Sequence, residues 1–142
     1  MAFLHRSASI CSTRLPKVLG PSVHSFVDYS LAALFVTAGV LFWKRHKNAS
    51  VSALLCGAGV MLNCLLTDYP GGIVPAISWE THGKIDVGLA GITAALPGLM
   101  GFGDDAQARF FEASAVVETL AAGFTDYRSH LEIQEQKRHS AA

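Results

Sequence analysis

Charged residues are scarce in this chain, and their scarcity limits what kind of protein it can be. Only 15% of its 142 residues are Asp, Glu, Lys or Arg, against about 25% in ordinary soluble domains. Hydrophobic residues make up 51%, so the charges are too few to cover a soluble globule. The 11 basic and 11 acidic residues cancel, which leaves no basic stripe for a nucleic-acid partner. A membrane protein of single-domain size is expected.

Motifs for covalent, nucleotide and redox chemistry are also missing. The three cysteines form no CxxC pair, and Cys56 and Cys64 stand eight residues apart in one apolar stretch. Both are expected to be buried thiols. We find no phosphate-binding glycine loop and no Ser-His-Asp set. The sequence therefore gives no basis for an enzymatic function.

A secretory signal is missing from the N-terminus as well. Residues 1–22 contain Arg6, Arg14 and Lys17 but no acidic residue, and no apolar run precedes a cleavage site. This composition fits an organelle transit peptide or a disordered basic arm ahead of a membrane segment. We expect the disordered arm, and a polar tail over residues 128–142.

Four apolar segments occupy most of the remaining chain. Each is about 20 residues long, the length with which a helix crosses a hydrocarbon core about 30 Å thick. The fourth is the weakest because it contains Glu112 and Glu118. An all-α membrane protein with four transmembrane helices is predicted. The segments run from His24 to Trp43, Ala49 to Thr67, His82 to Phe102, and Ala108 to Phe124.

The segments form an internal repeat with a period of 58 residues. Residues 23–69 align with residues 81–127 without a gap, and nine of the 47 positions are identical. Residues 70–80 link the two units. An even number of helices in each unit makes this a parallel repeat. It predicts two tandem helical hairpins in a four-helix bundle.

The repeated residues resemble those of the SPW-repeat integral membrane proteins. The shared pattern is His-x3-Asp opening one helix and Thr-Asp-Tyr closing the next, over Val23 to Tyr127. Ala38-Gly39-Val40 and Leu96-Pro97-Gly98 stand where Ser-Pro-Trp would be. The resemblance implies duplicated two-helix units in a bacterial inner membrane, with no assigned chemistry. An organelle membrane is the alternative location.

Polar residues at the ends of the segments are the main candidate site. In a parallel repeat they gather at one membrane face, and a His and an Asp four residues apart share one face of a helix. They could cap helices and anchor the interface. They could also bind a divalent metal through His24, Asp28, His82 and Asp86, or bind a haem between two histidines. The candidate cluster comprises His24, Asp28, Asp68, Tyr69, His82, Asp86, Asp126 and Tyr127.

Glu118 is a second candidate because it lies near the middle of the fourth segment. A carboxylate there costs at least about 2.5 kcal/mol on insertion scales, so it normally faces the interior of a bundle. The alternative is a shallow helix in which Glu118 reaches water. Its candidate hydrogen-bond partners are Asn63, Thr37, Thr93 and Thr119.

These observations predict a structural or interaction module of the lipid bilayer, with a homo-oligomer or another membrane protein as a possible partner. Two alternatives remain. One is an ion- or proton-handling protein that uses the His/Asp cluster and Glu118. The other is a metal- or haem-binding membrane protein.

Overall fold

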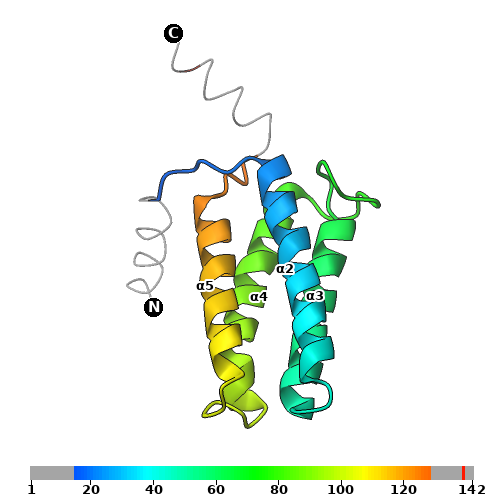
Figure 1. Ribbon diagram of the computed structural model, residues 1–142. Coiled ribbons are helices and arrows are strands. Elements are labelled where there is room, and N and C mark those ends of the chain that lie inside the picture. The colour runs from blue at the N-terminus through cyan, green and yellow to red at the C-terminus, as the bar shows by residue number, and fades with distance from the viewer. Residues whose placement is uncertain (1–14, 129–138, 140–142) are drawn as a thin grey trace.

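The structure, a computed structural model, describes residues 15–128 and 139, and residues 15–128 form four α-helices. Within these residues there is no β-strand, so the predicted all-helical fold is confirmed. α2 packs along α3, α4 packs along α5, and α3 contacts α4 across the middle of the bundle (Figure 1). The helices are α2 (Pro21–Phe42), α3 (Lys47–Leu65), α4 (Trp79–Leu99) and α5 (Ala108–Phe124).

Both hairpin turns lie at one end of the bundle, and we call it the hairpin end. Residues 43–46 connect α2 to α3, and residues 100–107 connect α4 to α5. The first described residues and the end of α5 lie together at the opposite end, which we call the terminal end (Figure 1). Residues 1–14, most of the predicted basic arm, lie outside the described residues. The same is true of nearly all of the predicted tail.

Two of the helices, α2 and α3, are long and apolar enough to span a membrane. α4 and α5 do not meet the same measure of length and hydropathy. The four-helix architecture is therefore observed, while the crossing of a membrane by all four helices stays a prediction.

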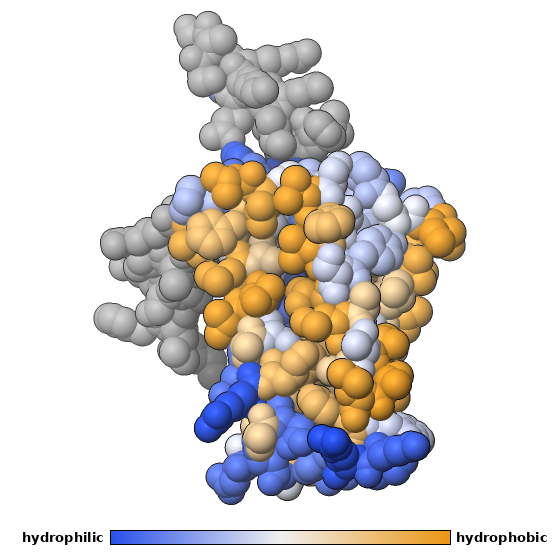
Figure 2. Space-filling view, viewed as in Figure 1, coloured by the Kyte–Doolittle hydropathy of each residue, from blue (hydrophilic) through white to orange (hydrophobic). Residues whose placement is uncertain are grey.

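The bundle exposes many large apolar side chains and buries a group of polar ones beside its apolar core. Large apolar side chains are exposed on every helix, for example Phe26 on α2 (74%) and Leu99 on α4 (77%). Figure 2 shows hydrophobic residues over much of the middle of one face and hydrophilic residues around the hairpin turns. Soluble proteins bury apolar side chains and pair the few polar ones inside. The buried polar side chains include His24, Ser25, Asp28, Ser50, Ser52, Asn63, Thr67, His82, Thr93, Ser114, Glu118 and Thr125.

Aromatic packing closes the bundle toward the hairpin end. Phe35, Phe102 and Phe111 are each no more than 1% exposed, and the rings of Phe102 and Phe111 lie 5.3 Å apart. Nε2 of His46 lies 2.8 Å from a carboxylate oxygen of Asp105, which joins the two hairpin turns. The two hairpins are thereby held together at the end away from the predicted polar cluster.

Main-chain contacts hold the chain just after α3 and α5 at the terminal end. Leu19 forms an isolated bridge with Thr125, and Thr67 forms one with Ile77. Each threonine follows the last turn of a helix, α5 or α3, so the bridges fix where these helices end. Both threonines are buried, and their side chains point into the site described next.

Candidate metal centre

Four side chains meet inside the bundle one to two turns from its terminal end. His24 and Asp28 come from α2, and His82 and Asp86 come from α4. Both histidines are at most 1% exposed, and the side chains of Asp28 and Asp86 are 7% and 12% exposed. The spacing of four residues places each His above its Asp on the inward face of its helix. The sequence predicted this quartet, and the structure brings it together.

The quartet is compact enough to surround a single ion. Nε2 of His24 lies 3.1 Å from Oδ2 of Asp28 and 3.0 Å from Oδ2 of Asp86. Nε2 of His82 lies 3.1 Å from the same two oxygens. The two Nε2 atoms are 3.3 Å apart. One potential ligand atom from each residue lies within 4.8 Å of the other three.

The other ring nitrogen of each histidine contacts a threonine hydroxyl. Nδ1 of His24 lies 2.7 Å from Oγ1 of Thr125, and Nδ1 of His82 lies 2.8 Å from Oγ1 of Thr67. Each hydroxyl also lies close to the carbonyl oxygen four residues earlier in its own helix, at Ala121 (2.6 Å) or Asn63 (2.5 Å).

These contacts determine where the imidazole protons lie. A carbonyl oxygen has no proton, so each threonine must donate its hydroxyl proton to it. The hydroxyl oxygen then accepts a hydrogen bond from the Nδ1–H of its histidine. In both neutral imidazoles Nε2 therefore presents a lone pair to the centre of the quartet. Outer hydrogen bonds of this kind orient metal-binding histidines.

Asp86 is held by more hydrogen bonds than Asp28. Oδ2 of Asp86 accepts from the Tyr127 hydroxyl (2.9 Å), and its Oδ1 accepts from the Asn63 amide (2.8 Å). Asp28 instead has the Cys64 thiol at 3.7 Å. Burial, and then the charge of Asp86, raise the pKa of Tyr127, so its hydroxyl keeps the proton that it donates. The carboxylate of the second repeat unit is thus held by more hydrogen bonds than that of the first, one from each unit.

A glycine lets Tyr127 reach the quartet. The tyrosine ring packs directly on Gly83 of α4, where a Cβ atom would lie 2.6 Å from the ring. Real Cβ atoms essentially never come so close to another heavy atom. Any larger side chain at position 83 would displace Tyr127 and remove its hydrogen bond to Asp86.

Aromatic rings cover the histidines on the side of the terminal end. Trp79 stacks on His82 with ring centroids 5.1 Å apart, and it meets His24 edge-on at 5.3 Å. Tyr69 stacks on the indole at 5.4 Å, and its ring lies 5.2 Å from that of His82. The indole Nε1 donates to the carbonyl oxygen of Asp126 at 2.9 Å, which fixes its position. Trp79, Tyr69 and Tyr127 form this aromatic cover.

Two predicted members of the polar cluster do not belong to it. Asp68 is exposed, and no contact with the quartet is found for it among the described residues. The Asp126 side chain binds Arg128, whose hydrogen bond holds the pKa of Asp126 below its usual value. In the Thr-Asp-Tyr triplets, the threonine and tyrosine side chains point inward, so the aspartates between them point away from the quartet.

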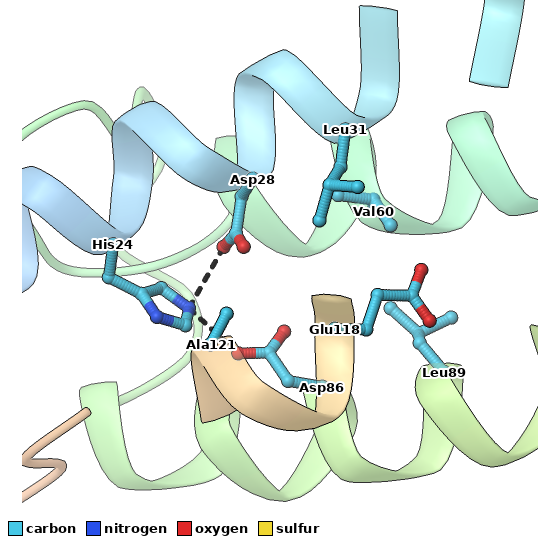
Figure 3. Close-up of a pocket in the computed structure, with 8 residues that line it drawn as sticks. All are labelled: His24, Asp28, Leu31, Val60, Asp86, Leu89, Glu118 and Ala121. Atoms are coloured by element: carbon cyan, nitrogen blue, oxygen red, sulfur yellow. Dashed lines mark hydrogen bonds and ion pairs between the residues drawn. The ribbon is translucent and has the colours of Figure 1, made fainter. Parts of the chain in front are cut away.

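Glu118 is buried inside the bundle, and the shallow-helix alternative, in which it reaches water, is wrong. It is only 7% exposed, and its Oε1 accepts from the Thr93 hydroxyl at 3.4 Å. Of the four candidate partners, Thr93 is thus the correct one. Thr37 and Thr119 bond carbonyl oxygens of their own helices, and the Asn63 amide bonds Asp86. Figure 3 shows the Glu118 carboxylate beside Val60 and Leu89, beyond the two aspartates.

Sequence reasoning did not identify all the residues that hold the quartet. It did not assign Thr67 and Thr125 to the site, although both recur at the period of 58 residues. That recurrence was the available signal. Trp79 and Asn63 had no such signal, because Pro21 and Ala121 occupy their equivalent positions in the other unit.

The chain matches no protein-family model, no curated protein and no solved structure. The resemblance to the SPW-repeat proteins therefore stays a prediction that depends on the repeated His-x3-Asp and Thr-Asp-Tyr residues, and the chemistry of the site must be argued from its geometry.

Proposed function

We propose that this chain is an integral membrane protein that binds one divalent transition-metal ion at His24, Asp28, His82 and Asp86. The observation that carries the proposal is the arrangement of donor atoms. Two imidazole lone pairs, oriented by threonine hydroxyls, point at two carboxylate oxygens 3.0–3.1 Å away. Four electron-pair donors so close together repel one another unless protons or a metal cation lie between them.

The charge of the quartet matches a divalent ion. Asp28 and Asp86 contribute two negative charges, and neutral imidazoles contribute none, so a dication makes the site neutral. Neutrality matters here because an uncompensated charge in a low-dielectric interior is costly. No lysine or arginine is among the buried side chains of the described residues. A bound dication would supply the charge that the surrounding bundle does not.

The spacing of the four protein donors favours zinc among such ions. Zn²⁺ binds imidazole nitrogen and carboxylate oxygen at about 2.0 Å, which gives a regular tetrahedron edges of about 3.3 Å. The N–O separations of 3.0–3.1 Å and the N–N separation of 3.3 Å are close to that value. A set of two nitrogens and two oxygens also suits zinc better than Mg²⁺ or Ca²⁺, which prefer oxygen alone.

A haem fits the same residues poorly. A haem held by two histidines lies as a flat plate between the two nitrogens. In this bundle the two Nε2 atoms are 3.3 Å apart, and Asp28 and Asp86 each lie within 3.1 Å of both. The carboxylates occupy the space that the macrocycle needs. The geometry therefore favours a bare ion.

The membrane location is supported by the large apolar side chains that the bundle exposes. α2 and α3 are each long and apolar enough to span a bilayer. α4 and α5 expose apolar side chains such as Val87, Ile92, Val116 and Leu120 on their outer faces and bury polar ones. A hydrocarbon environment stabilises such a surface, whereas water does not. We therefore propose that all four helices cross the membrane.

One preparation tests both the membrane location and the metal site. Membranes containing the protein are washed with alkaline carbonate, extracted with detergent, and the purified chain is analysed for metals. We expect the protein to resist the wash and to contain about one zinc ion per chain. The double variant His24→Gln/His82→Gln should contain almost none.

His46→Gln is the matched control. His46 lies in a hairpin turn and contacts Asp105, far from the quartet, so its loss should leave the metal content unchanged. Equal metal content in the wild type and the double variant would contradict the metal centre. If the wild type contains no metal after growth with zinc and yet is stably folded, the quartet has a purely structural role.

A further inference from the structure

A small cavity lies against the quartet on the side away from the aromatic cover. Three members of the quartet, His24, Asp28 and Asp86, line it together with Glu118 (Figure 3). Its volume is about 10 Å³, which is room for about one water molecule. Leu31, Val60 and Leu89 form its apolar wall. The cavity thus joins the proposed ion position to a buried carboxylate.

Glu118 is the one lining residue that has a fully buried polar atom without a hydrogen-bond partner among the described residues. The Oε1 atom accepts a long hydrogen bond of 3.4 Å from Thr93, while Oε2 has no partner among the described residues. The residue is 93% buried, since its exposed fraction is 7%. A buried carboxyl oxygen without a partner loses the hydrogen bonds that water would give it, and burial is unfavourable unless they are replaced. Such an atom beside a cavity of this size indicates a bound polar molecule.

The internal repeat shows that packing does not require a carboxylate at this position. Val60 is the residue equivalent to Glu118 in the first unit, and both residues line the same cavity. Leu31 and Leu89 are likewise equivalent, and so are Asp28 and Asp86. Of these three equivalent pairs in the cavity wall, only Val60 and Glu118 differ in residue type. An apolar side chain would serve for packing, so the carboxylate has another role.

We propose that the cavity is an open coordination position of the metal centre, which holds one water molecule between the ion and Glu118. This inference rests on the proposed metal site. A water molecule in a buried cavity needs two to four polar partners. The ion would bind its oxygen, and Glu118 Oε2 would accept one of its protons, which completes the hydrogen bonding of the orphaned atom.

An open position changes the kind of centre that this protein contains. Structural zinc sites are closed by four protein ligands, whereas reactive sites keep a position for water or another small oxygen donor. Here four protein ligands and one water would give a five-coordinate ion. The chemical class of ligand is a small, neutral oxygen donor, because the cavity has no space for a larger molecule.

Cobalt replacement tests this proposal, because the visible absorption of Co²⁺ is weak when the ion is five-coordinate and severalfold stronger when it is tetrahedral. The detergent-purified protein is stripped, loaded with Co²⁺ and compared with three variants. Glu118→Leu fills similar volume but accepts no hydrogen bond. Glu118→Gln retains an acceptor for the water. Glu112→Leu removes an exposed carboxylate of the same helix.

We expect weak, five-coordinate spectra for the wild type, Glu118→Gln and Glu112→Leu, and a severalfold stronger, tetrahedral spectrum for Glu118→Leu. A tetrahedral wild-type spectrum would overturn the open position while leaving the metal site intact. Because this result needs only the wild type, it tests the open position even if Glu118→Leu does not fold. A Glu118→Leu spectrum identical to a five-coordinate wild-type spectrum would overturn the role of Glu118. Failure of the wild type to bind Co²⁺ at all would overturn the metal site itself.

Discussion

The two repeat units contribute identical ligands to the quartet but unequal surroundings. Each unit supplies one His and one Asp four residues apart, and each supplies the threonine that orients the histidine of the other unit. Beyond these residues the units differ. Tyr127 and Asn63 both donate to Asp86, whereas Asp28 receives a contact only from the Cys64 thiol besides the two histidines.

This difference separates what the site requires from what it tolerates. A duplicated unit starts with two copies of every residue, and later substitutions remove those that either copy can lose. The retained pairs, His24 with His82 and Thr67 with Thr125, form one mutually dependent network. The contacts that differ between the units are the hydrogen bonds that hold Asp86 and the hydrogen bond to Glu118. We expect variants of the retained histidines and threonines to have similar effects in both units, and variants of residues that contact one carboxylate to affect one unit only.

The largest effect in this comparison is expected from the threonines. Thr67→Val and Thr125→Val keep the side-chain shape but remove the oxygen that fixes the histidine tautomer, so each should weaken zinc binding by about 10- to 100-fold. The two losses should be similar, because the two Nδ1 contacts are almost equal in length, at 2.7 and 2.8 Å. Competition with a zinc chelator measures the affinity.

Thr37→Val provides the control for the threonine variants. Thr37 makes the same type of bond to a carbonyl oxygen of its own helix, but it is exposed and contacts no histidine. Its replacement should leave zinc affinity unchanged. Restoration of affinity by Thr67→Ser would show that the hydroxyl is responsible. If either valine variant bound zinc normally, the threonine at that position would not be fixing the tautomer of the histidine that it contacts.

A smaller and one-sided effect is expected from the tyrosines. Tyr127→Phe removes the hydrogen bond to Asp86 and should weaken zinc binding by about 10-fold, the lower end of the effect of an outer-shell partner. Tyr69→Phe should leave the affinity unchanged, because no hydrogen bond joins the Tyr69 hydroxyl to Asp28 within the described part of the chain. The same chelator competition measures both. Equal losses from the two variants would show that the units support their carboxylates symmetrically.

The repeat explains why part of the site could be predicted from the sequence. His24 and His82 recur with their aspartates at a fixed period, and the spacing of four residues places each pair on one helix face. The apolar segments likewise predicted four helices within a few residues of their observed bounds. Local spacing and recurrence were sufficient for these features, because both are properties of the chain itself.

Other features depend on contacts that no local pattern encodes. Thr125 orients His24 although the two are 101 residues apart, and only the packing of α5 beside α2 brings them together. The sequence suggested Asp68 because it recurs, but the direction of its side chain depends on how the chain turns after α3. Trp79 covers the histidines without any equivalent residue in the other unit. Recurrence identifies conserved chemistry within the duplication, but it cannot identify residues that appear once.

The central claim is that two imidazoles and two carboxylates surround one metal ion. X-ray absorption at the zinc edge of the detergent-purified protein tests it most directly. We predict two imidazole ligands and oxygen donors at about 2.0 Å, with no sulfur shell at about 2.3 Å. Imidazole scattering should be lost in His24→Gln/His82→Gln. A sulfur shell, which would indicate the nearby Cys64 thiol, or a zinc spectrum without imidazole in the wild type, would contradict the account.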